Sequence, residues 1–428
     1  MIETLSYDVA IIGGGAAGLF AAKETASAGC STLVIDREKR TGGILNQCIH
    51  PGFGLHCFKR ELTGPEFAAE ADLLARNAGA EFRLDTTVRE IRRMDDGTFQ
   101  LDLASGKYGI STLNAKTVIL TAGCRERNRG NLAIPGKRPA GVWTAGAAQK
   151  LMNIDGMLPG KQAVIVGSGD IGLIMARRLT WSGVKVLAVI EILSHPSGLI
   201  RNIAQCLEDF NIPLYLNTTV TSIRGKKRVK SIAIAPLDEN GRADLTREEV
   251  LSCDTVLFSV GLLPETELLQ QCGVELDPMT GNGAKVGPDY MTSVPGIFSC
   301  GNVLHVHDLV DFVAQQSETC ACHVLHYLKN TSVSGENIPV CAGKDLAYTV
   351  PQSCRRGEEI CFYMRPRIIC RKAALCIFEG ETLLAKKVCM YVKPPEMLSI
   401  TLPGEKSASL GPGAVLHFEL CDVEGLEE

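Results

Sequence analysis

One pattern occurs twice in this chain and restricts its fold more than any other feature: a short apolar run, three spaced glycines and an apolar helical segment. In the first copy, Val9–Ile12 leads into Gly13, Gly15 and Gly18. An apolar run of this length is typical of a buried parallel strand. The first glycine allows a tight turn, the second lets the backbone approach a pyrophosphate, and the third lets the helix pack on the strand. The pattern predicts a helix whose amino end faces phosphate groups.

An acidic residue follows the first copy at the distance that a dinucleotide site requires. Asp36 ends a second apolar run, Thr32–Ile35, eighteen residues after Gly18. A carboxylate at this place can accept hydrogen bonds from a ribose. The strand before the glycines, the helix after them and this acid together predict a dinucleotide-binding site rather than a glycine-rich turn without a ligand.

The second copy begins 154 residues later (167 minus 13). There the run Ala163–Val166 leads into Gly167, Gly169 and Gly172, and Glu191 lies nineteen residues beyond the last glycine. An acid at this position favours a free ribose 2′-hydroxyl, and hence NAD over NADP. Two complete copies are far more specific than one, and they predict an α/β chain with two nucleotide sites.

Composition narrows the class of protein further. A length of 428 residues predicts two to four domains, and a net charge of −4 gives no reason to expect nucleic acid or an anionic membrane as a partner. No apolar run is long enough to span a membrane. The seventeen cysteines contain no Cys-x-x-Cys, and the amino-terminal residues do not resemble a basic leader. These features predict reduced thiols and a cytoplasmic location.

A long glycine-rich segment over residues 40–65 is the first candidate for chemistry. It contains Gly42 and Gly43, followed by Cys48 and His50. A loop of this length with little strand or helix pattern usually carries function. Two interpretations remain open: a thiol and an imidazole that take part in proton transfer, or a packed loop around a buried cysteine.

Between the two glycine patterns, the sequence predicts a helix, several strands and a connector. The helix covers 65–79, with Thr63 as its cap. An apolar run over 117–120 ends in small residues up to Gly123, which suits close backbone packing. Residues 124–160 are rich in charge and proline and predict a connector.

A late apolar run, Ile297–Cys300, closes on Gly301 and Asn302. Three polar residues then precede a predicted helix: His305, His307 and Asp308. The two histidines are candidate proton-transfer groups, and Asp308 or a residue near it is the predicted cap of the helix. Structural hydrogen bonding is the alternative role for the two histidines. No carboxylate triad accompanies them in the sequence, which argues against a metal site.

The character of the sequence changes after about residue 330. Short alternating runs separated by proline, glycine and charge predict a small β-rich domain over 341–428. The runs are Ala347–Val350, Arg367–Cys370, Ala374–Phe378, Leu398–Leu402 and Val415–Leu420. The basic cluster at 365–372 predicts an exposed or partner-facing strand rather than a nucleic-acid site.

The two glycine patterns, the strand end at 121–123 and the late Gly301-Asn302 pair together resemble the two-dinucleotide-binding-domain flavoproteins. This superfamily includes glutathione-reductase-like and thioredoxin-reductase-like enzymes, and the resemblance covers residues 1 to about 330. It implies Rossmann-like three-layer domains, with FAD on the first pattern, NAD on the second, and the FAD domain split around the NAD domain. The implied boundaries are 1–126 and 256–332 for the FAD domain and 127–255 for the NAD(P) domain, with 341–428 as the small β-rich domain.

The resemblance also implies which residues contact the cofactors. Val88 would meet the adenine, and Asn302, which stands where the superfamily usually has an aspartate, can still hydrogen-bond a ribityl hydroxyl. The full set of implied cofactor-binding residues is Gly13, Gly15, Gly18, Asp36, Gly42, Gly43, Val88, Gly123, Gly167, Gly169, Gly172, Glu191, Gly301 and Asn302. The catalytic candidates beside the flavin are Cys48, His50, His305 and His307.

The cysteines depart from the disulfide reductases of this superfamily. Those enzymes place two cysteines five residues apart beside the flavin, after a Gly-Gly pair. Here only Cys48 stands near that place, and Cys57 is nine residues further on. The sequence therefore disfavours a redox dithiol but leaves a single-thiol mechanism open.

The segments GGILNQCIHPGFGLH, GNVLHVHDLVD and KKVCMYVKPPEM are similar to one subgroup, the flavoproteins that accompany FAD-dependent glycerol-3-phosphate dehydrogenases. More distant resemblance extends to opine oxidase and hydrogen cyanide synthase subunits. The subgroup implies hydride exchange between FAD and NAD(H), with electrons passing to or from a partner dehydrogenase. Two alternatives remain: an NADH-dependent thiol or quinone reductase that uses Cys48, and a non-catalytic flavin-binding subunit that scaffolds a dehydrogenase complex. A homo-oligomer is also possible.

Overall fold

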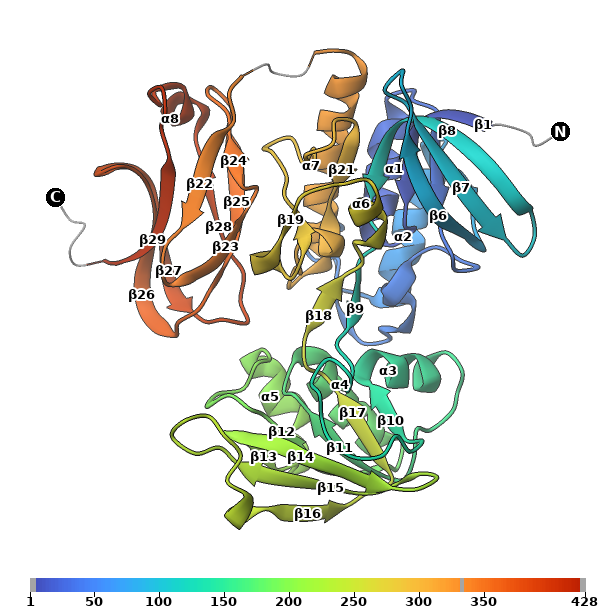
Figure 1. Cartoon of the computed structure of the whole chain (residues 1–428), viewed down its shortest axis with the longest axis vertical. Helices are drawn as coiled ribbons and strands as arrows, with labels where there is room; N and C mark the ends of the chain where they lie inside the picture. Colours follow the sequence, from blue (N-terminus) through green and yellow to red (C-terminus); the bar gives the residue numbers. More distant parts are fainter. Residues whose placement is uncertain (1–4, 332–334, 424–428) are drawn as a thin grey trace. The chain divides into compact units, whose positions relative to one another are not determined.

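The structure is a computed structural model that describes residues 5–331 and 335–423. The chain forms two compact units, one from Met1–Cys124 with Pro264–Glu428 and one from Arg125–Leu263 (Figure 1). The chain therefore passes into the second unit after residue 124 and returns to the first after residue 263.

A mostly parallel sheet forms the centre of the first unit, with the order β5-β2-β1-β8 and with β21 also parallel to β8. Antiparallel β7 and β6 extend it from the first half of β8. Val9, Ala10 and Ile11 are fully buried, as expected for a parallel strand that is covered on both faces. The strands are β1 (Leu5–Ile12), β2 (Thr32–Ile35), β5 (Glu81–Arg83), β6 (Thr86–Arg93), β7 (Phe99–Ser105), β8 (Gly109–Leu120) and β21 (Ile297–Ser299).

Three helices pack with this sheet into one core: α1 (Ala16–Ser27), α2 (Gly64–Asn77) and α7 (Val310–Leu328). The predicted cap of the second helix is confirmed, because the Glu66 carboxylate accepts hydrogen bonds from the N–H and hydroxyl of Thr63 at 2.8 and 2.7 Å. Such a cap contributes about 1 kcal/mol to helix stability. Shorter elements complete this part: β3 (Pro51–Phe53), β4 (Leu62–Thr63), α6 (Glu267–Gln271), β19 (Leu276–Asp277) and β20 (Gly283–Ala284).

Residues after 337 form two further sheets around their own apolar core. The first sheet has the order β24-β22-β29-β26-β27, and the second has the order β23-β25-β28. Their elements are β22 (Ile338–Ala342), β23 (Leu346–Val350), β24 (Ser353–Cys354), β25 (Ile360–Pro366), β26 (Cys370–Glu379), β27 (Thr382–Val392), β28 (Leu398–Leu402), α8 (Gly404–Ala408) and β29 (Leu416–Asp422).

The strand expected over Arg367–Cys370 is wrong, because residues 367–369 form a bend before β26. Its physical cause is local: the Arg367 N–H bonds the carbonyl of Asp345, and its Nε bonds the carbonyl of Leu346. These bonds hold the chain outside the sheet at this point. The long strands β25 and β27 were not predicted; in β27, Lys386 and Lys387 interrupt the apolar pattern.

The second unit is a three-layer α/β unit of its own. Its parallel sheet has the order β10-β17-β11-β12-β13, with the helices in one apolar cluster and an antiparallel sheet, β14-β15-β16, in another. The elements are β10 (Val142–Thr144), α3 (Ala145–Asn153), β11 (Gln162–Val166), α4 (Asp170–Trp181), β12 (Lys185–Ile190), α5 (Ile200–Cys206), β13 (Leu214–Tyr215), β14 (Thr218–Gly225), β15 (Val229–Pro236), β16 (Glu249–Ser252) and β17 (Thr255–Phe258). Short strands β9 (Cys124–Glu126) and β18 (Leu262–Pro264) lie where the chain changes units. The predicted α/β class is confirmed.

Candidate functional site

The first glycine turn packs closely against Thr121 and against its own backbone, so a side chain on Gly13 or Gly18 would clash. Gly13 has a φ of +114°, and a Cβ there would lie 2.5 Å from the carbonyl oxygen of Thr121. A Cβ on Gly18 would lie 1.9 Å from the Gly13 oxygen. At Gly15, by contrast, a Cβ would meet no atom within 4 Å. The turn is therefore closed toward the protein and open at the start of α1.

The amino end of α1 is free to bind an anion. Gly15 is its N-cap, no side chain caps it, and its first turn carries no acidic residue. The first N–H groups of a helix have no partner within the helix, so an uncapped start such as this fits a pyrophosphate.

Asp36 stands beside this helix start in a position to serve a ribose. Its Oδ2 accepts the Gly14 N–H at 2.5 Å, and its Oδ1 accepts the Glu38 N–H at 2.7 Å. Burial raises the pKa of Asp36, although these two N–H groups act in the opposite direction. The carboxylate is only half-buried, and each oxygen keeps a second lone pair for a ligand hydroxyl. Asp36 and the open helix start together fit a dinucleotide.

Two segments that are distant in sequence lie against the same turn. The Gly42 N–H donates to the Gly14 carbonyl at 2.7 Å. Gly301 has a φ of +76°, and a Cβ there would lie 2.7 Å from the Cβ of Ala17 in α1. The structure therefore brings together the first glycine pattern, the Gly42-Gly43 pair and the Gly301-Asn302 pair.

The thiol of Cys48 is poorly suited to act as a nucleophile. It donates to the Ile44 carbonyl at 3.4 Å, and burial raises its pKa to about 11. The neighbouring His50 bonds the Pro51 carbonyl through Nδ1 at 2.9 Å, and its ring lies 5.2 Å from that of Phe53. Because the thiolate is the reactive form, the raised pKa of Cys48 opposes a nucleophilic role.

His305 and His307 are joined by a residue that the sequence did not single out. Gln316 on α7 accepts the Gly301 N–H through Oε1 at 2.8 Å, which fixes the orientation of its amide. Oε1 then accepts from His307 Nε2 at 3.1 Å, while Nε2 donates to His305 Nε2 at 2.8 Å. Neutral His305 therefore carries its proton on Nδ1, and neutral His307 carries it on Nε2.

The two histidines are buried together under the carboxy-terminal sheets. Their ring centroids are 4.2 Å apart, and the Tyr363 ring lies 5.6 Å from His305. Both Nδ1 atoms are buried, and neither has a hydrogen-bond partner among the described residues. Burial lowers the pKa of His305 well below its usual value, and it lowers the pKa of His307 to about 4. Both rings are neutral at physiological pH.

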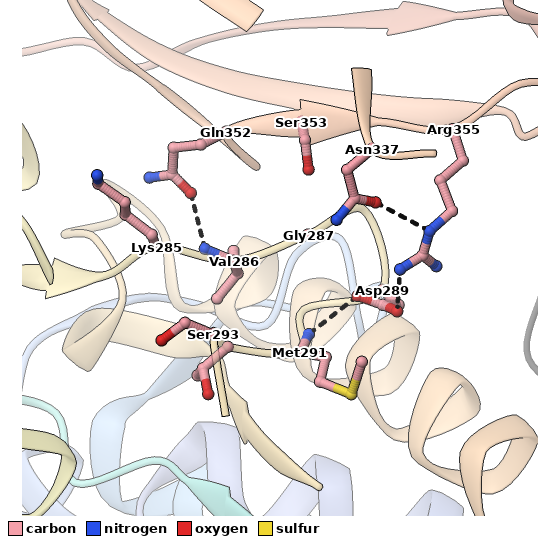
Figure 2. A pocket seen from close by; sticks show the side chains of 11 residues that line it. Lys285, Val286, Gly287, Asp289, Met291, Ser293, Asn337, Gln352, Ser353 and Arg355 are labelled. Atoms are coloured by element: carbon pink, nitrogen blue, oxygen red, sulfur yellow. Dashed lines mark hydrogen bonds and ion pairs between the residues drawn. The ribbon is translucent and has the colours of Figure 1, made fainter. Parts of the chain in front are cut away.

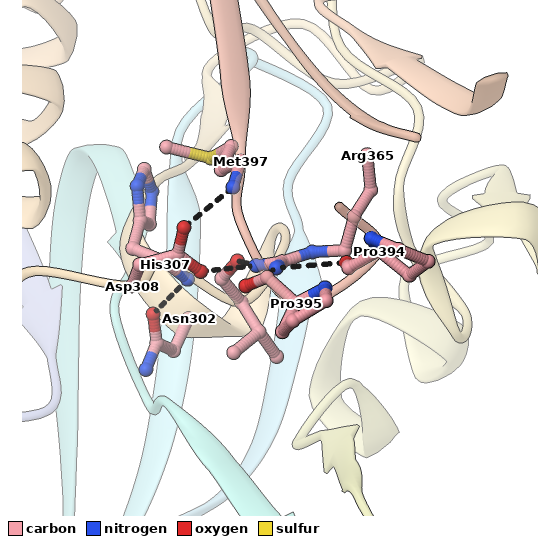
Figure 3. A network of polar contacts seen from close by, with 8 residues as sticks. Asn302, His307, Asp308, Arg365, Pro394, Pro395 and Met397 are labelled. Carbon is pink, nitrogen blue, oxygen red and sulfur yellow. Dashed lines mark hydrogen bonds and ion pairs between the residues drawn. The ribbon is translucent and has the colours of Figure 1, made fainter. Parts of the chain in front are cut away.

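The segment that follows Asn302 is tied to the carboxy-terminal sheets by a polar network (Figure 3). Arg365 donates to the Val306 carbonyl at 2.9 Å and to the Asp308 carboxylate at 2.7 Å. Asp308 also accepts the Met397 N–H at 2.5 Å. The predicted cap was Asp308 or a residue near it, and the N-cap position falls on the neighbouring Leu309. Asp308 does not cap α7, because its carboxylate is held by Arg365 and Met397.

Asp311, in the first turn of α7, was also missed by the sequence analysis. Its buried carboxylate accepts backbone N–H groups of Gly54, His56 and Cys57 at 3.2, 2.9 and 2.8 Å. The glycine-rich loop is therefore fixed to α7 by a residue more than 250 positions away. In the sequence, the signal for Asp311 is an acidic residue near the start of a helix. This signal does not identify the loop that its carboxylate binds.

The second glycine turn is closed by a strand end that is distant in sequence, in the same way as the first. Gly167 has a φ of +92°, and a Cβ there would lie 2.0 Å from the Ser259 carbonyl oxygen. The start of α4, at Gly169, has no side-chain cap, and the Gly172 N–H donates to Ser259 Oγ at 3.0 Å. The start of α4 is less open than that of α1, because its first turn carries Asp170 and a Cβ on Gly169 would lie 3.2 Å from Ser259 Oγ.

Glu191 is turned toward protein donors. Its carboxylate accepts the N–H of Ser168 at 3.0 Å, the hydroxyl of Ser197 at 2.8 Å and the N–H of Leu193 at 3.0 Å. The side chain is only 3% exposed. Contact between Glu191 and a ribose stays a prediction.

The remaining predicted contacts lie on β6 and after β8. Val88 is buried in β6, and Gly123, with a φ of +72°, follows β8 with open space at its Cβ position. All seventeen cysteines are free thiols. Over residues 5–331 and 335–423, no three acidic, histidine or cysteine side chains are arranged to hold a metal ion. No helix in these ranges has the length and apolar character needed to cross a membrane.

Comparison with known proteins agrees with this arrangement. The pyridine nucleotide-disulphide oxidoreductase family matches residues 7–320. Thioredoxin reductase of Treponema pallidum is 30% identical over 69% of this chain and 89% of its own length. Hydrogen cyanide synthase subunit HcnB of Pseudomonas protegens is 26% identical over 63% of this chain, and an opine oxidase subunit of Agrobacterium tumefaciens is 25% identical over 69%. The matched regions span about 60% of each of these two relatives.

Comparison with a solved structure also supports this family. The thioredoxin reductase of T. acidophilum superposes with a TM-score of 0.61 at 25% identity, over 76% of this chain and 99% of that one. The family binds FAD and NAD(P), and the relatives are oxidoreductases. On the family match, the protein is a flavoprotein oxidoreductase that uses FAD and NAD(P). The chain belongs to the pyridine nucleotide-disulphide oxidoreductase family.

Proposed function

We propose that this protein exchanges a hydride between FAD and NAD(H) and passes the electrons to or from a partner dehydrogenase, such as a glycerol-3-phosphate dehydrogenase. The observation that carries the proposal is the convergence of three distant segments at the open start of α1, without a second cysteine near Cys48. The cofactors supply the redox chemistry, and the protein supplies binding, orientation and charge stabilisation.

The FAD site is assigned to the first unit. The uncapped start of α1 would hold the pyrophosphate, and Asp36 would accept a ribose hydroxyl. Asn302 Oδ1 accepts the His307 N–H at 3.0 Å, which leaves its amide NH₂ to donate to a ribityl hydroxyl. The full proposed set in this unit is Gly13, Gly15, Gly18, Asp36, Gly42, Gly43, Val88, Gly123, Gly301 and Asn302.

The catalytic candidates have proton-holding rather than nucleophilic roles in this proposal. Cys48 retains its proton because burial raises its pKa to about 11. The neutral pair keeps one buried N–H on His305 Nδ1 and one buried lone pair on His307 Nδ1. Burial lowers the pKa of both rings, so the pair would hold the proton of His305 rather than take up a second one. His50 lies in the same loop as Cys48 and is proposed to act beside it.

The nicotinamide nucleotide is assigned to the second unit, at the start of α4 with Gly167, Gly169 and Gly172. NAD is preferred in this proposal because Glu191, and no arginine, directly follows β12. The free thiols support a reducing compartment, and we place the protein in the cytoplasm.

A partner dehydrogenase is favoured over a disulfide substrate by the cysteine chemistry. Disulfide reduction by a single thiol requires a reactive thiolate, and the raised pKa of Cys48 opposes its formation. The opine oxidase and hydrogen cyanide synthase relatives are named as subunits, which supports an assembly with a second protein.

Anaerobic titration of the purified yellow protein with NADH tests the proposal. We expect the flavin absorbance to bleach without any added partner, and NADPH to be less effective. A protein that retains its flavin but is not bleached would instead favour a scaffolding role. Full turnover of a disulfide substrate, lost in Cys48→Ser, would favour the thiol reductase.

A further inference from the structure

A pocket of about 320 Å³ lies between α7 and the carboxy-terminal sheets of the first unit. Its walls include three aromatic rings, from Phe312 on α7, Tyr363 on β25 and Tyr391 on β27. The lining also includes Lys387, Met397 and Ser399. The volume is at the lower end of the range for small-molecule sites, which suits one or two fused rings.

One cation lines the pocket, the exposed Lys387, and no carboxylate of the described residues pairs with it. The Lys387 ammonium is held by the Ser399 carbonyl at 2.8 Å and the Ser399 hydroxyl at 3.3 Å. Among residues 5–331 and 335–423 it forms no ion pair with a carboxylate. The ammonium has three donors, so one remains for a ligand.

Two further cations border the same wall. The Arg371 guanidinium lies 6.0 Å from the centroid of the Tyr391 ring, and the Lys393 ammonium lies 5.5 Å from it. Neither forms an ion pair within the described part of the chain. The pocket therefore combines aromatic walls with nearby cations that have no carboxylate partner, which distinguishes it from a cavity in an apolar core.

A second pocket in the same unit provides a contrast (Figure 2). It has about 200 Å³, and its two cations already have partners. Arg355 pairs with Asp289 at 2.7 Å, and Lys285 lies 3.6 Å from Glu275. An anion would have to compete with these carboxylates, so of the two pockets the one at Lys387 has charge available for a ligand.

We infer that the pocket at Lys387 binds a planar aromatic anion, an aryl or quinonoid ring that carries a carboxylate or sulfonate. The ring would pack among Phe312, Tyr363 and Tyr391, and the anion would bind Lys387. Placing this ligand on the electron-transfer side of the protein rests on the proposed function, in which Asn302 contacts the ribityl chain. Met397, which lines the pocket, donates its N–H to Asp308 in the segment after Asn302.

Calorimetric titration of the holoprotein with 2-naphthalenesulfonate and with uncharged 2-naphthol tests the inference. We expect saturable binding of the sulfonate, weakened about tenfold by Lys387→Gln because a charge-assisted hydrogen bond is lost. Binding of the naphthol should be insensitive to Lys387→Gln, whereas Tyr391→Ala should weaken both ligands. Lys344→Gln, an exposed lysine of the same sheets that does not line the pocket, is the matched control.

Two outcomes would overturn the inference: no saturable binding of the sulfonate up to about 1 mM, or equal affinity in the wild type and the Lys387→Gln variant. Bleaching by NADH is measured on the same samples without the sulfonate. Its failure would refute the proposed hydride exchange but leave the binding result intact, so the two failures are distinguishable.

Discussion

The two glycine patterns have nearly the same sequence but different surroundings. At the first pattern, residues from three distant segments meet, and Asp36 remains half-exposed. At the second, Ser259 closes the turn from the same unit, and Glu191 is buried among serines. Both turns are closed by a residue from a distant strand end, Thr121 at the first and Ser259 at the second, so the difference lies in the acid. Asp36 keeps exposed surface for a ligand, whereas protein donors surround the carboxylate of Glu191. The comparison indicates that the spacing of glycines identifies a phosphate turn, and that the surrounding contacts decide how it is used.

The largest expected effect is on flavin binding, and it differs between the third glycines of the two patterns, Gly18 and Gly172. Gly18→Ala places a Cβ 1.9 Å from a backbone oxygen, and we expect loss of bound flavin and about 3 kcal/mol of stability. In Gly172→Ala the nearest atom is the Ser259 Cβ at 2.7 Å, and we expect the flavin to be retained while NADH binds more weakly. The ratio of flavin to protein absorbance and the KM for NADH measure both. Full flavin content in Gly18→Ala would contradict the comparison.

The next effect concerns the buried histidines, which have no counterpart at the second pattern. His307 has a folded pKa of about 4 and an unfolded pKa of about 6.5, so the unfolded chain binds more protons between these values. The contribution of His307 to the free energy of unfolding therefore has its full value above about pH 6.5. It falls by about 3 kcal/mol as the pH drops toward 4. Urea denaturation across this interval measures it. The curve of His307→Gln should be flatter, and an unchanged slope would show that His307 is not buried in the neutral form.

A smaller effect is expected at the network that holds the segment after Asn302. Arg365→Gln removes the charge that holds Asp308 and should cost about 2 kcal/mol, because a partly buried carboxylate loses its partner. Arg371→Gln is the control, because Arg371 is exposed and forms no ion pair among the described residues. Denaturant midpoints of both variants provide the measurement. Equal midpoints would indicate that the network contributes nothing measurable.

The smallest effect tests whether Glu191 reaches a ribose. Glu191→Gln should reduce the preference for NADH over NADPH by roughly threefold if the carboxylate leaves its serine partners for the ligand. Ser197→Ala removes one of those partners without changing the acid, and should not lower the preference. The ratio of kcat/KM values for the two nucleotides reports the effect. An unchanged ratio in Glu191→Gln would assign Glu191 a purely structural role.

Several local features were predictable from sequence because their causes are local. The spacing of the glycines, the apolar runs beside them and the cap at Thr63 involve residues within a few positions of one another. The role of Asp308, by contrast, depends on a distant residue. Its position before a helix suggested a cap, but Arg365, 57 residues away, binds its carboxylate instead.

The sequence by itself determined that the chain carries two phosphate turns, lacks a paired cysteine near Cys48 and ends in β-rich segments. Only the tertiary structure decided that Gln316 links the two histidines, that Asp311 fixes the glycine-rich loop and that Lys387 faces a pocket of aromatic rings. The physical reason is the range of the interactions. Backbone turns follow from neighbouring residues, whereas the partner of a buried polar group is chosen by the packing of elements that are distant in the sequence.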